Sequence, residues 1–298
     1  MQYLLLASVI LLNTAQSIVA KQYGLVARKS NTFFFSAISS FVAMLFFMFG
    51  IGFRFDYRPA VLGYSVAFGV CYAAAIGGNF LAIKNGPLAL STLVMSYSLV
   101  IPTVYGIVAQ DEKLSLLGAV GIVCLCISLV LINELKGKDD AGDETRNETA
   151  VRSNSAVSIK WLIYVLISFF GNGICATVQK VQPVVFDGRY KNEFMIVGLL
   201  VSGVLFMILS LADKENLRES TFPCVGFGTL KGAANGISNM IVIVLVTMIP
   251  GTILYPTVSA GAVVFGFILA ITIYKERLSK KQLVGYAFGI IAVILLNM

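Results

Sequence analysis

The chain alternates between long stretches without a charged residue and short clusters of charge. The charge-free stretches are residues 1–20, 30–53, 59–83, 85–110, 114–133, 161–179, 194–212 and 282–298. A further stretch, 232–274, is too long for one crossing and contains a turn signal at Met248–Gly251. If it is extended back to residue 222, it divides into two helices. The result is ten apolar segments of about 20 residues, each able to cross about 30 Å of hydrocarbon as a helix.

The apolar segments do not alternate between polar and apolar residues, which argues against the strands of an outer-membrane barrel. Composition excludes several other classes. Hydrophobic residues make up 58% of the chain, charged residues make up 12%, and the mean hydropathy is +0.87. A soluble enzyme, a disordered chain and a disulfide scaffold do not have this composition. We expect an all-α membrane protein with ten transmembrane helices.

Two short patterns occur twice, in the same order. Asn13 precedes Lys21 by eight residues, as Asn172 precedes Lys180. The pattern Glu-x-Leu-Ser opens an apolar segment at 112–115 and again at 276–279. Repetition in order predicts a duplication.

A unit of five helices has an odd number of crossings, so its copy must enter the membrane from the opposite side. We therefore predict two inverted repeats, residues 1–134 and 160–298, joined by a polar linker at 135–159. Inverted repeats are a common basis of alternating-access transporters, in which the substrate site lies between the halves.

These residues resemble the drug/metabolite transporter (DMT) superfamily, in its ten-helix EamA-like form. The resemblance covers essentially the whole chain and rests on Val19–Lys21, its echo at Val178–Lys180, and the two Glu-x-Leu-Ser patterns. Leu12-Asn13 replaces a common Trp-Gly, and the second segment lacks a common arginine, so the subfamily and the substrate stay open. The resemblance implies that helices 1, 3, 4, 6, 8 and 9 line the pathway.

The eighth predicted helix carries a polar stripe. Lys231, Asn235 and Asn239 are four residues apart, and Ser238 lies close to the same face. Polar groups in hydrocarbon are costly, so we expect this stripe to line a cavity. The alternative for the lysine is that its side chain extends to the membrane surface.

Other polar side chains in the apolar segments extend the predicted pathway. We expect the substrate-binding residues to be Asn13, Gln16, Asn79, Tyr97, Asn172, Lys231, Asn235, Asn239 and Tyr255. For the amides the alternative is hydrogen bonding between helices, and for Tyr97 it is simple packing. Pro102 and Pro256 interrupt the fourth and ninth predicted helices at comparable places, which is typical of the binding site in repeat transporters.

The charges narrow the function. No Asp or Glu lies within the ten apolar cores, which disfavours a carboxylate proton relay. Lys21, Lys180 and Lys231 favour neutral, zwitterionic or anionic substrates. We predict a transporter of small polar metabolites, such as amino acids, working by alternating access. The alternatives are an exchanger of phosphorylated or nucleotide-linked sugars, a lipid flippase or scramblase, and a passive channel.

The remaining expectations follow from the same pattern. We expect no enzyme activity, no cofactor, no metal and no nucleic-acid partner. The expected partners are a small-molecule substrate and membrane lipids, and the oligomeric state stays open. We expect a multi-pass integral protein of the plasma (inner) membrane of a prokaryote, with an organelle membrane as the alternative. Most Lys and Arg residues follow odd-numbered segments, which predicts both termini outside, whereas the resemblance implies both inside.

Overall fold

The computed structural model describes residues 2–26, 31–52, 55–56, 58–85, 91, 94–95, 97–133, 159–212, 214–272 and 280–296. All regular elements in these ranges are helices. They are α1 (Gln2–Val26), α2 (Thr32–Gly50), α3 (Pro59–Asn85), α5 (Val100–Ala109), α6 (Leu116–Asn133), α8 (Ile159–Val185), α9 (Lys191–Leu211), α10 (Lys214–Leu245), α11 (Gly251–Thr272) and α12 (Lys280–Leu296). Apart from Ile159, the predicted linker lies outside the described residues, as does the second Glu-x-Leu-Ser pattern.

The structure confirms an all-helical chain with membrane-spanning capacity. Within the described ranges, five helices are long and apolar enough to cross a membrane: α1, α2, α3, α8 and α9. Shorter apolar helices occupy Val100–Ala109, Leu116–Ser128 and Leu283–Ala292. Large apolar side chains also lie exposed on the outside of the bundle, including Leu116 at 84% and Phe222 at 91%. Such a surface is costly in water and suits a lipid environment.

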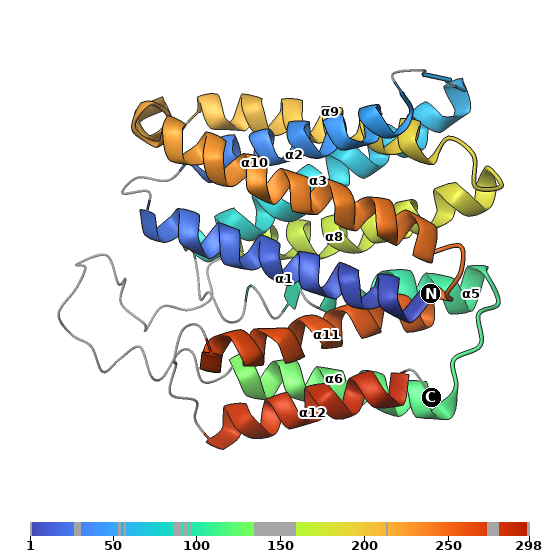
Figure 1. Cartoon of the computed structure of the whole chain (residues 1–298). Coiled ribbons are helices and arrows are strands. Elements are labelled where there is room, and N and C mark those ends of the chain that lie inside the picture. Colours follow the sequence, from blue (N-terminus) through green and yellow to red (C-terminus); the bar gives the residue numbers. More distant parts are fainter. Residues whose placement is uncertain are drawn as a thin grey trace.

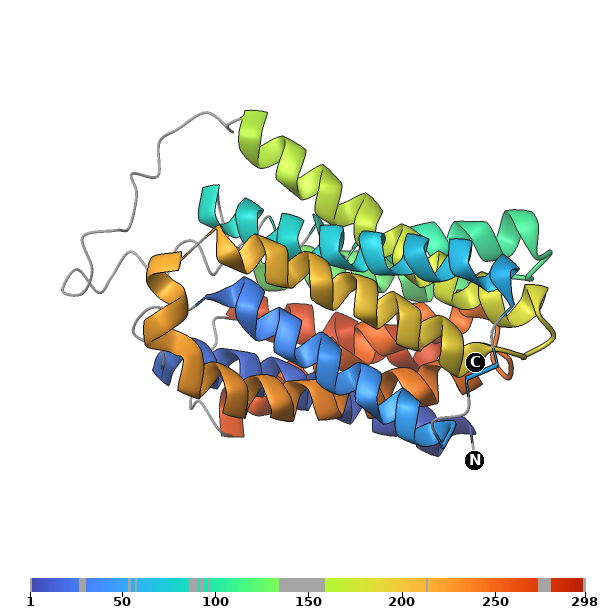
Figure 2. The ribbon, with the colours of Figure 1, turned by 90° about the horizontal axis from the view of Figure 1, so that it is seen from above.

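The helices form one bundle of roughly antiparallel rods (Figures 1 and 2). Both termini lie at the same end of the bundle, which we call the termini end (Figure 1). α1 begins at this end, whereas α8 begins at the opposite end (Figure 1). The main neighbours are α3 with α8, α1 with α10, α2 with α9 and α10, α3 with α9, and α6 with α12.

Glycine allows α3 and α8 to pack backbone against backbone. A Cβ atom added at Gly171 would lie 2.8 Å from the nitrogen of Ala75 and 2.9 Å from the carbonyl oxygen of Cys71. Ser168 strengthens this contact, because its hydroxyl donates a 2.9 Å hydrogen bond to the carbonyl of Ala75. Small residues at such positions are the usual means of close helix packing in membranes. The contact fixes the two helices that form one wall of the cavity described below.

The turn predicted at Met248–Gly251 is confirmed, since α10 ends at Leu245 and α11 begins at Gly251. The reversal brings the first turns of α11 against α1 and α10, where Leu254 and Tyr255 join a buried apolar cluster with Val9 and Leu245. Pro256 lies inside α11, one turn beyond its start.

Candidate functional site

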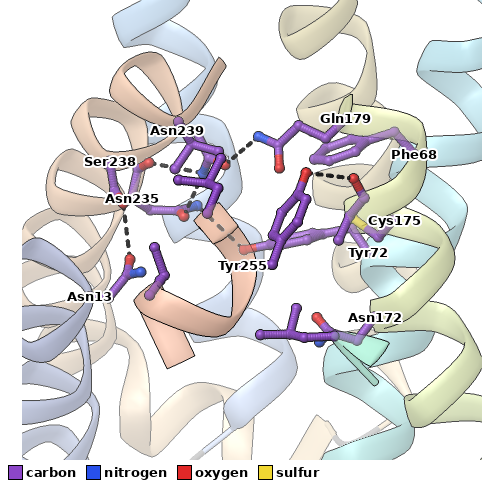
Figure 3. A pocket seen from close by; sticks show the side chains of 15 residues that line it. Asn13, Phe68, Tyr72, Asn172, Cys175, Gln179, Asn235, Ser238, Asn239 and Tyr255 are labelled. Carbon is purple, nitrogen blue, oxygen red and sulfur yellow. Dashed lines mark hydrogen bonds between the residues drawn. The ribbon is translucent and has the colours of Figure 1, made fainter. Parts of the chain in front are cut away.

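A cavity of about 250 Å³ lies in the middle of the bundle, between α1, α3, α8, α10 and α11 (Figure 3). Its polar lining consists of amides and hydroxyl groups: Asn13, Tyr72, Asn172, Gln179, Asn235, Ser238, Asn239 and Tyr255. The apolar lining includes Phe68, Leu99, Cys175, Val242 and Leu254. Among the described residues that line it, none carries a charge.

One wall of the cavity is a chain of hydrogen-bonded side chains that runs from α8 through α10 to α3. Gln179 Nε2 donates to Asn239 Oδ1 at 2.9 Å, and Asn239 Nδ2 donates to Asn235 Oδ1 at 2.8 Å. Asn235 Nδ2 then donates to the Tyr72 hydroxyl oxygen at 3.3 Å. Figure 3 shows these groups converging on one space. Each amide is therefore oriented, because Gln179 is engaged through its nitrogen and Asn235 and Asn239 are engaged through both their oxygen and their nitrogen.

A second polar group joins α1 to α10. Asn13 Oδ1 accepts hydrogen bonds from the Ser238 hydroxyl at 2.9 Å and from Gln16 Nε2 at 3.1 Å. Asn13 lines the cavity, whereas Gln16 does not. Gln16 thus acts on the cavity by orienting the Asn13 amide.

The remaining wall is formed by α8 and α11. Asn172 Nδ2 donates to the Ser98 hydroxyl at 2.6 Å, and the Tyr255 hydroxyl donates to the carbonyl of Ala176 at 3.0 Å. Tyr255 is buried, and together with Leu254 it belongs both to the cavity lining and to the apolar cluster around Val9 and Leu245.

The structure brings five of the predicted substrate-binding residues together around this cavity: Asn13, Asn172, Asn235, Asn239 and Tyr255. The other four lie elsewhere. Gln16 does not line the cavity but donates a hydrogen bond to Asn13, which does. Asn79 is on α3, and its buried Oδ1 has no hydrogen-bond partner among the described residues. Lys231 and Tyr97 are the other two.

Lys231 is on α10 but does not reach the cavity. Its Nζ lies 4.9 Å from the centre of the Phe35 ring on α2, a cation–π contact. Phe35 belongs to an apolar cluster with Tyr23 and Cys224. The positive charge therefore lies over an aromatic face on α2, and Lys231 is not among the residues that line the cavity.

Tyr97 lines a different, apolar cavity of about 230 Å³ between α5, α6 and α11. Its hydroxyl donates a 3.0 Å hydrogen bond to the carbonyl of Cys126 on α6. The other residues around this space include Val100, Ile107 and Leu125. The Tyr97 hydroxyl is thus already hydrogen-bonded, and most of the residues around it are apolar and provide few hydrogen-bonding groups for a polar solute.

Phe68, Tyr72 and Cys175 are among the lining residues that a search for polar residues at helical spacing does not find. Phe68 and Cys175 are apolar in character, and Tyr72 stands alone among small residues of α3. A mid-helix aromatic residue with a hydroxyl is the one signal that points to Tyr72. Gln179 and Ser238 lie in polar patterns that the sequence already shows, next to Lys180 and Asn239.

A buried ion pair lies at the termini end of the cavity. Lys180 Nζ is 2.8 Å from Glu112 Oε1, and the two side chains are 2% and 14% exposed. Glu112 enters from the connection between α5 and α6, so a carboxylate reaches the bundle although no apolar segment contains one. The same carboxylate accepts hydrogen bonds from the backbone nitrogens of Gly251 at 3.0 Å and Thr252 at 3.1 Å.

Several effects act on the pKa of Glu112. Burial raises it, but the hydrogen bond from Lys180, the two backbone N–H groups at the start of α11 and the charge of Lys180 lower it more. The net result is a pKa below the usual value for a glutamate. Glu112 is therefore ionised at neutral pH and pairs with Lys180, one of the three lysines that favour a neutral, zwitterionic or anionic substrate in the sequence analysis.

Comparison with known proteins identifies the fold alone. No protein-family model matches the chain, and no curated protein matches its sequence. Chains of known structure do match, among them one described only as "Crystal structure of protein". It is 13% identical, with a TM-score of 0.63, over 99% of this chain and 95% of that chain. The helical arrangement is therefore shared with a solved protein over nearly its full length.

Proposed function

We propose that this chain is a transporter of small polar metabolites that works by alternating access, with the central cavity as its solute site, and that it belongs to the DMT superfamily. The observation that carries the proposal is the cavity itself. It lies between five helices, α1, α3, α8, α10 and α11, and is lined by oriented amides and hydroxyls. Polar side chains gathered inside a membrane bundle are rare and commonly mark a pathway for a solute or an ion.

The helix neighbours support a repeat of two five-helix halves. In such a repeat α1 corresponds to α8, α2 to α9, α3 to α10, α5 to α11, and α6 to α12. If each helix is replaced by its counterpart, the α3–α8 pair becomes the α10–α1 pair. In the same way α2–α10 becomes α9–α3, and α1–α11 becomes α8–α5. All six of these helix pairs are in contact in the structure. The α2–α9, α5–α11 and α6–α12 pairs map onto themselves. The opposite directions of α1 and α8 agree with inversion (Figure 1).

The charges around the cavity favour neutral or zwitterionic solutes over anions. Lys180 is neutralised by Glu112, and Lys231 faces the Phe35 ring, so neither supplies a free cation to the cavity. The side chain of Lys21 lies outside the described residues. A net charge moved into a site without a counter-charge loses its hydration without compensation. Amides, in contrast, offer both donors and acceptors to amino, carbonyl and hydroxyl groups.

Binding and transport test the proposal in two steps. Purified protein is screened by thermal shift against neutral amino acids, amides and polyols, and against dicarboxylates and sugar phosphates. A ligand that binds the folded state raises the melting temperature. We expect stabilisation by members of the first group. The same solute should then show counterflow in proteoliposomes, which a carrier supports and an open pore does not.

The matched variants are Asn239→Ala and Ser17→Ala. Asn239 is the centre of the amide chain, whereas Ser17 is exposed and, among the described residues, hydrogen-bonds within its own helix to the carbonyl of Asn13. Asn239→Ala should abolish the shift and the counterflow, and Ser17→Ala should leave both unchanged. Ohmic current without counterflow would show that the protein is a channel and not a carrier. Stabilisation by sugar phosphates alone would show that the substrates are phosphorylated sugars and not neutral or zwitterionic solutes.

A further inference from the structure

We propose that the ion pair between Glu112 and Lys180 is a latch that closes the termini end of the cavity, and that this end opens when the pair breaks. The inference rests on the proposed function, because it assigns the latch to one of the two sides between which such a transporter alternates. It gives a role to the one buried carboxylate–lysine pair that the described residues contain.

The latch lies directly beyond the cavity. On α8, Asn172, Ala176 and Lys180 are four residues apart and so share one face, and the first two line the cavity. On α11, Gly251 and Thr252 precede the lining residue Tyr255 by about one turn. The pair therefore sits one helical turn past the solute space on both helices.

The pair also holds three elements together. Glu112 belongs to the connection between α5 and α6, Lys180 belongs to α8, and the two backbone donors open α11. The carboxylate lies at the N-terminus of α11, where the helix dipole favours negative charge. Glycine makes room for it, since a Cβ atom at Gly106 would collide with both side chains and one at Gly251 would collide with Lys180.

The closed arrangement leaves polar groups unsatisfied, which lowers the cost of opening. Lys180 Nζ has three N–H groups, yet among the described residues only Glu112 offers it an acceptor. The Thr252 hydroxyl is fully buried and likewise has no hydrogen-bond partner among the residues that the structure describes. Water that enters on opening would satisfy these groups, because buried polar groups without partners are costly.

Proline weakens both helices next to the latch. Pro183 in α8 cannot donate to the carbonyl of Gln179, and Pro256 in α11 cannot donate to the carbonyl of Thr252. Each missing hydrogen bond lies at or beside a residue of the latch. The adjoining parts of α8 and α11, which Glu112 links through Lys180 and through the backbone nitrogens of Gly251 and Thr252, can thus bend apart with less disruption than regular helices.

The experiment uses Cys175, which lines the cavity and is 6% exposed. The other four cysteines are replaced by alanine, and sealed proteoliposomes are treated with a membrane-impermeant maleimide from each side in turn. With Glu112→Gln we expect labelling of Cys175 to become faster by at least about fivefold, and only from the termini side. A factor of this size is at the lower end of the changes in equilibrium that such two-state elements show. The control is Asp111→Asn in the same connection, an exposed position with φ 50 that asparagine tolerates.

A second variant covers the case in which Glu112→Gln does not fold because it leaves the lysine unpaired. Glu112→Gln with Lys180→Gln removes both charges together, so that neither charge is left buried without its partner. If either variant folds and labels at the wild-type rate from the termini side, the latch is overturned. Faster labelling in a protein that shows no counterflow of any solute would instead overturn the proposed carrier and leave the latch in place.

Discussion

Gln179 on α8 and Asn239 on α10 are joined by a 2.9 Å hydrogen bond between their side-chain amides. Asn239 is also held by Asn235, through both the side-chain oxygen and the backbone carbonyl. The two helices therefore meet in a fixed orientation across the cavity wall. The donor and acceptor positions of these amides that the hydrogen bonds leave unused are available to a solute.

The Gln179–Asn239 contact should appear as an energetic coupling. In a double-mutant cycle of Gln179→Ala and Asn239→Ala, we expect about 0.6 kcal/mol of coupling in the free energy of unfolding, the size typical of hydrogen bonds between membrane helices. Unfolding in mixed micelles measures it. The control cycle pairs Gln179→Ala with Ser17→Ala, which share no contact. Equal coupling in both cycles would contradict the contact.

The close packing of α3 on α8 should depend on glycine. Gly171→Leu forces a side chain against the backbone of Ala75 and Cys71, so we expect a loss of roughly 1–3 kcal/mol in the free energy of unfolding. Gly63→Leu on the same α3 meets nothing within 4 Å and should be neutral or stabilising, since leucine favours helix over glycine. Similar losses for both variants would show that α3 and α8 are not in contact.

The fold could be predicted from the sequence because charge marks the ends of membrane helices. The charge-free stretch 59–83 corresponds to α3 at Pro59–Asn85, and 194–212 falls within α9 and its end. The turn signal at Met248–Gly251 divides the longest stretch at the right place. The predicted halves 1–134 and 160–298 stay a prediction, because the packing of helices does not test where each half begins.

The site could be predicted only in part, because spacing gives a face of a helix but not a depth. Asn235 and Asn239 reach the cavity, whereas Lys231, one turn earlier on the same stripe, meets the Phe35 ring. Glu112 was missed as a buried group because it lies in a connection and enters the bundle only through folding. A search limited to charges inside apolar segments cannot find such a residue.

Tyr255 and Tyr97 are both predicted substrate-binding residues, but removal of the hydroxyl group should affect solute binding at only one of them. Tyr255 lines the central cavity, and Tyr97 lines the apolar one. Each hydroxyl donates one hydrogen bond to a backbone carbonyl, so Tyr255→Phe and Tyr97→Phe should each cost about 1 kcal/mol of stability. Only Tyr255→Phe should weaken solute binding, by roughly two- to tenfold. Isothermal titration with a solute from the screen measures this. Equal weakening in Tyr97→Phe would place the solute in the apolar cavity instead.

The stabilisation from Glu112 should be lost in acid. Its pKa is lowered in the folded state, so the unfolded chain binds the proton more readily at this position. The contribution is therefore fully present above the ordinary pKa of about 4.5 and disappears as the pH falls through the lower folded-state pKa.

Melting temperatures of the wild type and of Glu112→Gln, measured between pH 7 and pH 3, test this dependence. We expect the wild type to melt higher near neutrality and the difference between the two to shrink as the pH falls below about 4.5. Asp111→Asn, in the same connection but exposed, should follow the wild type throughout. A difference that stays constant down to pH 3 would mean that the Glu112 carboxylate is not held by Lys180 and the start of α11.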